Sequence, residues 1–272
     1  MNWLDALILG IVQGLAEYLP ISSSGHLEIC RDILGLQLSG ADALEFDVVL
    51  HVATVLSTIV VLWKEFVPLC KSFFTIARDD NFFYVCKILL SCIPVAIVGL
   101  CFKDFVESFF GGGLTVVGIC LLVTAVLLSF AYYFRNPARE AKYHETGHDI
   151  TWKDAFIIGC SQAVAVLPGL SRSGTTIATG LLLGDKRDKI AQFSFFMVII
   201  PILGEALLGI KDIIAGEGVG ESVGTLPLVI GFIASFVVGC MACSWMLKIV
   251  KKGKLVWFAV YCLAVGILCI CW

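Results

Sequence analysis

The chain has 272 residues, of which 59% are hydrophobic and 15% are charged, and its mean hydropathy is +0.95. A water-soluble domain is about 25% charged, so this composition excludes a soluble globular protein. The formal net charge of −3 and the lack of a basic stripe exclude a nucleic-acid-binding surface. The excess apolar residues must face lipid, which predicts an all-α polytopic membrane protein.

The first element in chain order, 1–38, is apolar but broken at its centre by LPISSSGH at 19–26. Pro, Gly and consecutive Ser end a helix, turn the chain and start another helix. Each half has roughly 15–18 residues, which is too short to cross a bilayer comfortably. Within lipid, non-helical backbone survives only where protein or a wet cavity covers it. The segment is therefore predicted to be a re-entrant helical hairpin, and 152–185, broken by LPGLSRSGTT at 167–176, a second one.

Six unbroken apolar runs predict membrane-spanning helices. They lie at about 46–63, 83–102, 113–134, 190–211, 224–247 and 255–272. Most of the twelve cysteines fall within apolar runs and are expected to pack as inert thiols. The N-terminal MNWLDALILG has no Lys or Arg, so we expect no cleaved signal peptide.

The charges between these runs predict the topology. Lys and Arg gather in 64–78, 135–153, 186–189 and 248–254, which the positive-inside rule assigns to the cytoplasm. The connections poor in positive charge are assigned to the outside: 39–45, 103–112 and 211–223. All assignments agree only if the first hairpin enters and leaves from outside, the second from inside, and both termini lie outside.

An internal repeat appears when the sequence is shifted by 149 residues. Gly10, Gln13, Ala16, Ser22, Ser24 and Gly25 then fall on Gly159, Gln162, Ala165, Ser171, Ser173 and Gly174. We expect one membrane domain, 1–272, with one repeat at about 1–134, a cytoplasmic linker at about 135–151 and a second repeat at about 152–272. A hairpin plus three spans in each half gives the halves opposite orientations, which is an inverted repeat.

The two hairpin tips carry the polar residues. Helices that begin just after 20–25 and 168–174 would aim free N–H groups at one place, and helix N-termini bind phosphate. The first tip offers hydroxyls and a histidine, and the second offers hydroxyls and a guanidinium: Ser22, Ser23, Ser24 and His26, then Ser171, Arg172, Ser173, Thr175 and Thr176. Arg172 is the strongest indication of function, because an arginine inside an apolar segment costs several kcal/mol unless it is partnered.

Glu17 lies in the helix entering the first tip, with Gln13 one turn earlier. A carboxylate beside an anion site is explained if it holds a divalent cation or transfers protons. Simpler explanations remain open: the serines as ordinary helix caps, Glu17 as a structural partner of Arg172, and His26 and His51 as ordinary helix histidines.

The segments GIVQGLAEYLPISSSGHL at 10–27 and LPGLSRSGTTIA at 167–178 closely resemble the two signature motifs of the BacA-type undecaprenyl-pyrophosphate phosphatases, the bacitracin-resistance proteins. Those motifs take the form (E/Q)xxxE…SS(S/T)GH and PGxSRSxxT. The resemblance extends over essentially the whole chain. It implies hydrolysis of undecaprenyl pyrophosphate, the precursor of the cell-wall carrier lipid, at the outer face of the bacterial cytoplasmic membrane, and it also suggests a homodimer.

The resemblance assigns catalytic roles to Glu17, Ser23, His26 and Arg172, with Glu17 as ligand of a divalent cation such as Mg²⁺ or Ca²⁺. It assigns phosphate binding to Ser22, Ser24, Ser171, Ser173 and Thr176. Gln13 stands where some members have Glu, so it is an accessory residue and the motif holds one carboxylate. The nucleophile stays open between Ser23, with His26 or Glu17 taking its proton, and a metal-activated water.

A second function remains compatible with the sequence. Inverted repeats with broken helices are also the architecture of transporters. The chain could instead flip undecaprenyl phosphate or move another anion.

Overall fold

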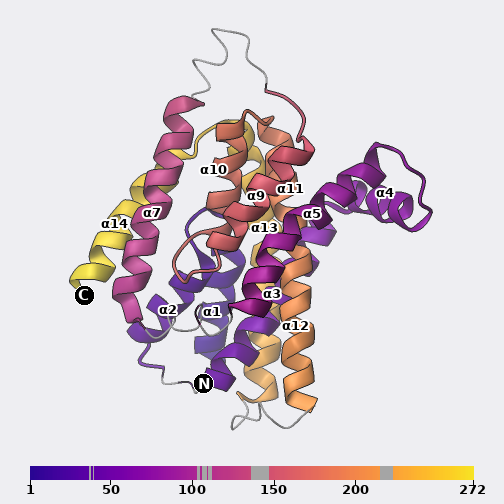
Figure 1. Cartoon of the computed structure of the whole chain (residues 1–272). Helices are drawn as coiled ribbons and strands as arrows, with labels where there is room; N and C mark the ends of the chain where they lie inside the picture. The colour runs from indigo at the N-terminus through magenta and orange to yellow at the C-terminus, as the bar shows by residue number, and fades with distance from the viewer. Residues whose placement is uncertain are drawn as a thin grey trace.

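The computed structural model describes all residues except 37, 39, 103–104, 106–108, 110–111, 136–146 and 215–222. Within the described part, the regular elements are all α-helices. They are α1 Trp3–Ala16, α2 Ser23–Ile33, α3 Gly40–Val61, α4 Trp63–Phe74, α5 Asp80–Cys101, α7 Gly113–Phe134, α9 Trp152–Val164, α10 Arg172–Leu183, α11 Arg187–Met197, α12 Ile199–Ile214, α13 Thr225–Lys251 and α14 Val256–Cys271 (Figure 1). The prediction of an all-helical polytopic membrane protein is confirmed. Most of the expected linker lies outside the described residues.

The predicted spans correspond to helices, with two differences in detail. Five described segments are long and apolar enough to cross a membrane: Asp42–Val61, Asp80–Cys101, Gly113–Phe134, Arg187–Leu207 and Thr225–Lys251. The sixth, α14, has only 16 residues. The predicted span at 190–211 is two helices, since α11 ends at Met197 and α12 begins at Ile199. Pro201 explains this break, because its ring clashes with the carbonyl four residues earlier.

Helix α4 was not expected, because the sequence places a charged cytoplasmic loop at 64–78. The structure has a helix over Trp63–Phe74 and a turn before α5, and α4 projects from the body of the protein (Figure 1). Trp63, Val67 and Phe74 are exposed on it. The segment has too few apolar residues for a span but enough for an amphipathic helix, which a search for long apolar runs overlooks.

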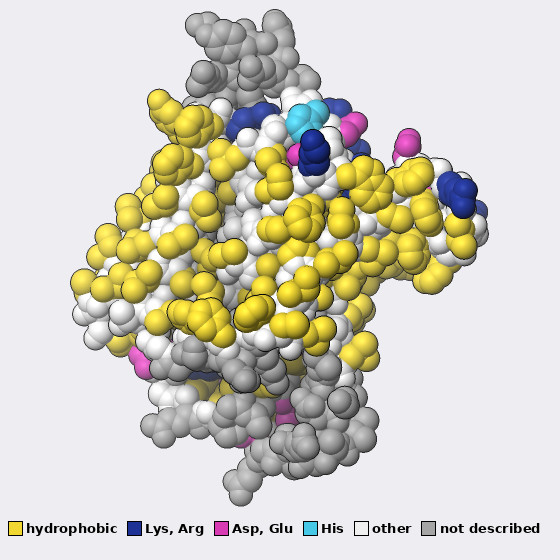
Figure 2. All heavy atoms as spheres, viewed as in Figure 1, with side chains coloured by type: hydrophobic (Ala, Val, Ile, Leu, Met, Phe, Trp, Pro, Cys, Tyr) yellow, Lys and Arg dark blue, Asp and Glu magenta, His cyan; other side chains and the backbone are white. Residues whose placement is uncertain are grey.

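The exposed surface is largely apolar around the middle of the protein. Hydrophobic side chains cover a broad band, and the Lys and Arg visible in this view lie mainly toward the upper end (Figure 2). Leu100 and Trp257 are 72% and 71% exposed. Such an extensive apolar surface suits contact with lipid rather than water.

Both hairpins have the same local structure at their entry. In α1 the side chain of Asn2 accepts from the N–H of Asp5, whose carboxylate accepts from the N–H of Asn2. Thr151 and Asp154 form the same capping box at the start of α9. Asn2 corresponds to Thr151 and Asp5 to Asp154, each at a shift of 149 residues. In Figure 1, α1 begins near the lower end of the protein and α9 begins nearer the upper end. These observations agree with the predicted inverted repeat, whose symmetry stays a prediction.

Each hairpin packs against the other half of the chain, through a glycine. A Cβ atom at Gly10 of α1 would lie 2.5 Å from the carbonyl oxygen of Gly231 in α13. A Cβ atom at Gly159 of α9 would lie 2.4 Å from the carbonyl oxygen of Ser91 in α5. Small residues allow such close backbone approach between helices in membranes. This packing holds both hairpins in fixed positions and so positions their tips.

Candidate active site

Each hairpin tip ends in a serine that caps the returning helix. The Ser22 hydroxyl accepts from the N–H of Gly25 at 3.3 Å, and the Ser171 hydroxyl accepts from the N–H of Gly174 at 3.1 Å. Ser22 has a φ of 71°, a conformation that side-chain-bearing residues rarely adopt. The capping explanation is therefore confirmed for these two hydroxyls, and each cap fixes the direction in which a helix N-terminus points.

The two tips touch each other inside the protein. A Cβ atom at Gly25 would lie 3.0 Å from the Cα atom of Gly169. The Ser173 hydroxyl donates to the carbonyl oxygen of Leu19 at 3.3 Å, which joins the first turn of α10 to the first tip. The structure thus brings together two segments about 150 residues apart in the chain.

Glu17 and Arg172 form an ion pair where the tips meet. The Arg172 Nη2 atom donates to Glu17 Oε1 at 2.8 Å. The Glu17 side chain is 6% exposed and that of Arg172 is 26% exposed, so the guanidinium retains an open side. A charge pair inside a membrane protein is costly to desolvate, and such groups usually mark a functional site.

Two further side chains bind the other oxygen of the same carboxylate. The Ser23 hydroxyl donates to Glu17 Oε2 at 2.6 Å, and the Gln13 side-chain N–H donates to it at 3.0 Å. Gln13, Glu17, Ser23 and Arg172 therefore form one connected cluster, as the two motifs predict. Within it, Ser23 has a carboxylate placed to accept its proton.

His51 belongs to this cluster although the sequence favours it only weakly. Its Nε2 atom lies 3.7 Å from Glu17 Oε2, and its Nδ1 atom lies 2.8 Å from the Asp47 carbonyl oxygen. Tyr18, which the sequence does not single out, anchors the first tip: its hydroxyl donates to the Thr54 carbonyl oxygen at 2.6 Å and is hydrogen-bonded to the Thr58 hydroxyl at 2.8 Å. A histidine inside an apolar run was the only signal for His51. The sequence does not say which residue it faces.

His26 points away from the cluster in this structure. Its Nδ1 atom lies 2.8 Å from the Ser22 carbonyl oxygen, and its Nε2 atom lies 2.8 Å from the Tyr261 hydroxyl of α14. The rings of His26 and Tyr261 also stack, with centroids 5.6 Å apart. Both ring nitrogens thus have partners other than Ser23, which leaves Glu17 as the nearer proton acceptor for Ser23.

The remaining predicted phosphate-binding residues lie in the first turns of the two tip helices. The Thr176 hydroxyl bonds to the Arg172 carbonyl oxygen at 2.9 Å and to the Ser194 hydroxyl at 2.6 Å, which secures the start of α10. The Ser24 and Ser22 hydroxyls are 3.4 Å apart. A pocket opens beside the Glu17–Arg172 pair, lined also by Tyr18, Thr54, Val55, Thr58, Ser173, Ser194, Phe195, Val198 and Ile202.

The residues around Glu17 suit a divalent cation. Gln13 Oε1 is buried and has no hydrogen-bond partner among the described residues. The Gln13 amide nitrogen donates to Glu17 Oε2 at 3.0 Å, and His51 Nε2 lies 3.7 Å from the same oxygen, so a carboxylate, an amide and an imidazole meet here. Mg²⁺ is commonly bound by one or two carboxylates, with phosphate oxygens and water completing the shell. The single carboxylate of the motif is therefore sufficient if the substrate supplies oxygens.

Comparison with known proteins agrees with the motifs. An undecaprenyl-diphosphatase of Bacteroides thetaiotaomicron is 56% identical over 267 residues, covering 98% of this chain and 97% of that protein. One from Christiangramia forsetii is 45% identical over 267 residues, with the same coverage. Undecaprenyl-diphosphatase 2 of Bacillus thuringiensis is 36% identical over 271 residues, covering 97% and 96%. The family described as bacitracin resistance protein BacA matches residues 6–268, so the chain belongs to the BacA family.

Proposed function

We propose that this protein is an undecaprenyl-diphosphatase, which hydrolyses undecaprenyl diphosphate to undecaprenyl phosphate and phosphate. The relatives that carry this name match nearly the whole chain. The observation that carries the proposal is the Glu17–Arg172 pair at 2.8 Å, placed where two capped helix N-termini meet within an apolar protein. This arrangement supplies a fixed site for a phosphate group attached to a lipid.

Substrate binding follows from the position of these groups. The prenyl tail stays in lipid, where each buried CH₂ contributes about 0.8 kcal/mol. The diphosphate approaches the exposed side of Arg172, whose guanidinium exchanges its carboxylate partner for phosphate oxygens, since it can bind either group through two N–H donors. The first-turn N–H groups of α2 and α10 add positive potential at the same place.

Ser23 is the proposed nucleophile. Its hydroxyl already donates to Glu17 Oε2 at 2.6 Å, so Glu17 can accept the proton as Ser23 Oγ attacks the terminal phosphorus. The bond between that phosphorus and the bridging oxygen breaks, the proton on Glu17 passes to the departing phosphate oxygen, and undecaprenyl phosphate leaves. Water then hydrolyses the phosphoserine and releases phosphate, with Glu17 again handling the proton. The alternative, direct attack by water, uses the same carboxylate and the same Arg172.

Glu17, Gln13 and His51 are the residues that would hold a divalent cation. It would neutralise charge on the phosphate oxygens. Gln13 and Ser23 keep the carboxylate oriented, and Arg172 pairs with the opposite carboxylate oxygen until phosphate oxygens replace it.

The test is phosphate release from undecaprenyl diphosphate by the purified protein in detergent. We expect release with Mg²⁺ or Ca²⁺, and loss of at least about tenfold after EDTA treatment, reversed by adding the cation back. A transporter has no membrane across which to move its substrate in detergent, and it would release no phosphate. If folded, cation-supplied protein released no phosphate, the phosphatase proposal would fail and transport would be favoured. The homodimer stays a prediction.

We place the site toward the outer face of the bacterial cytoplasmic membrane. The positive charges of the sequence fall on α4, the start of α9, the α10–α11 turn and the connection after α13. Those regions would be cytoplasmic, and both termini would lie outside. An enzyme reporter active only in the cytoplasm should be inactive when fused to either end, and active when inserted at 252–254. Two cytoplasmic termini would overturn this topology.

A further inference from the structure

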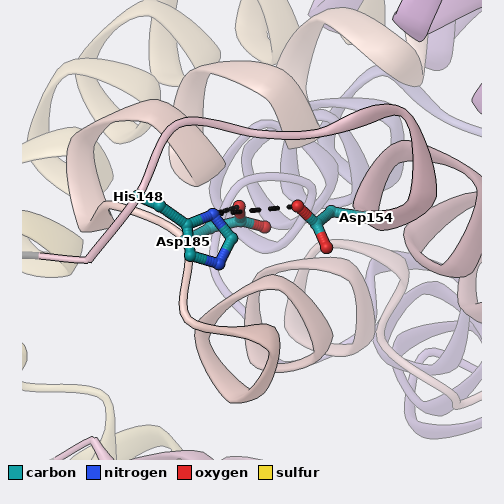
Figure 3. Close-up of side chains that lie close together, drawn as sticks. All are labelled: His148, Asp154 and Asp185. Atoms are coloured by element: carbon teal, nitrogen blue, oxygen red, sulfur yellow. Dashed lines mark ion pairs between the residues drawn. The ribbon is translucent and has the colours of Figure 1, made fainter.

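A second polar cluster lies at the base of the second hairpin, away from the candidate active site. It joins His148 before α9, Asp154 in the first turn of α9, and Asp185 just after α10. Figure 3 shows the imidazole and both carboxylates facing one another. Arg172 and Asp185 are at opposite ends of α10, about 20 Å apart at 1.5 Å per residue. The cluster is therefore a separate site.

The spacing of the three side chains matches that of ligands around a single ion. His148 Nδ1 lies 3.5 Å from Asp185 Oδ1 and 3.8 Å from Asp154 Oδ2. One ligand atom from each residue lies within 4.8 Å of the other two. Ligands bound about 2.0–2.2 Å from one metal are at most about 4.4 Å apart, so shifts of a few tenths of an ångström would suffice.

The Asp185 carboxylate gives an independent reason to expect a cation at this site. The residue is 0% exposed, and neither carboxylate oxygen has a hydrogen-bond partner among the described residues. The positive groups that act on this carboxylate are His148, Arg135 and Lys87, and Asp154 adds a like charge. A buried carboxylate without hydrogen bonds is unfavourable unless a cation compensates it. The carboxylate packs closely against Gly180: a Cβ atom added at that glycine would lie 3.1 Å from Asp185 Oδ2.

His148 is held in position by the backbone on both sides. Its N–H donates to the Gly184 carbonyl oxygen at 3.0 Å, and its own carbonyl oxygen accepts from the N–H of Lys186 at 2.9 Å. The ring Nε2 atom lies 3.2 Å from the Leu183 carbonyl oxygen. Metal-binding histidines commonly donate their second ring N–H to such an oxygen, which leaves the other nitrogen free to coordinate. Here that nitrogen is Nδ1, which faces both carboxylates and also lies 3.1 Å from the Asp149 carbonyl oxygen, a contact that coordination would replace.

We propose that His148, Asp154 and Asp185 bind a divalent transition ion of the Zn²⁺ class. One imidazole and two carboxylates are ligands that Zn²⁺ accepts, with water in the remaining position on the half-exposed side of His148. The ion would tie the segment before α9 to the ends of both legs of the hairpin that carries Arg172. Its role would be structural, and it does not depend on the proposed enzymatic activity.

The experiment measures Zn²⁺ binding to the full-length protein in detergent. The protein is purified with a tag that lacks histidine, stripped with chelator, and equilibrated with Zn²⁺. We expect Asp185→Asn and His148→Ala each to bind one equivalent less than the wild type. At a hundredfold excess over Kd, Zn²⁺ should raise the melting temperature of the wild type by about 5–10 °C and leave that of Asp185→Asn unchanged.

Asp149→Asn is the matched control. Asp149 adjoins His148, but its side chain is 72% exposed and pairs with Lys186 at 3.1 Å, so this variant should bind Zn²⁺ as the wild type does. Glu17→Gln removes any Zn²⁺ held at the candidate active site, and in that background Asp185→Asn should still bind one equivalent less, which separates the two sites. Equal Zn²⁺ binding and equal stabilisation in the wild type and Asp185→Asn would overturn the proposal. The three residues would then form only an ion pair of His148 with its two aspartates.

Discussion

Replacing Arg172 with alanine should lower phosphate release from undecaprenyl diphosphate by about 10²–10³-fold. Removing a fixed donor that stabilises developing negative charge costs a reaction about that much. Arg172 is the only arginine or lysine that the described residues place in the pocket beside Glu17. Arg172→Lys should recover part of the loss, because an ammonium keeps the charge but lacks the planar pair of N–H donors.

The control is Arg78→Ala, an exposed arginine in the turn before α5, which should release phosphate at the wild-type rate. Steady-state kinetics in detergent, with size-exclusion chromatography of each variant, provides the measurement. A well-folded Arg172→Ala protein that kept more than about a tenth of the wild-type rate would show that the phosphate binds elsewhere.

The second large effect is expected for Glu17→Gln, which keeps the shape of the side chain but removes its charge. Proton transfer by a positioned side chain typically contributes 10²–10⁴-fold, so release should fall by at least about 10²-fold. The cation required for half-maximal activity should also rise, because an amide is a weaker ligand than a carboxylate. Unchanged activity and unchanged cation dependence would remove Glu17 from the mechanism.

Loss of folding has to be separated from loss of chemistry in this variant. Glu17→Gln leaves Arg172 without its carboxylate, which destabilises a partly buried charge pair. The double variant Glu17→Gln/Arg172→Ala removes both charges, so it should melt at a higher temperature than Glu17→Gln and still release no phosphate. Recovery of stability without activity would assign both residues to the reaction.

Ser23→Ala distinguishes the two nucleophiles. If Ser23 attacks the phosphorus, this variant should lose activity as fully as Glu17→Gln, because no covalent intermediate can form. If water attacks, Ser23→Ala should lose much less, since only one hydrogen bond to the Glu17 carboxylate is removed. Near-full turnover by Ser23→Ala would exclude the covalent route.

The repeat also explains why the site is asymmetric. At the shift of 149, Ser23 corresponds to Arg172 and Glu17 corresponds to Val166. The capping serines are the same in both tips, whereas the carboxylate occurs only in the first tip and the guanidinium only in the second. The repeated serines thus cap the tip helices, and Glu17, Ser23 and Arg172, which differ between the two tips, carry the proposed proton transfer, attack and phosphate binding.

The sequence by itself determined the membrane class, the positions of most helices and the two interrupted hairpins. These follow from local properties: the length of apolar runs and the residues that break or cap a helix. It also identified Gln13, Glu17, Ser23 and Arg172 as candidate site residues, because polar groups inside apolar segments are energetically unfavourable and usually have a function. It did not identify α4, because polar residues interrupt the apolar ones along this amphipathic helix and leave no long apolar run.

Only the tertiary structure decided which of these side chains meet. It directs His51 toward Glu17 and His26 toward Tyr261. It also brings His148 and Asp154, at the start of α9, together with Asp185, just after α10. Such contacts depend on how rigid helices pack, through close approaches such as that of Gly10 to Gly231, and the order of residues along one chain does not encode that packing locally.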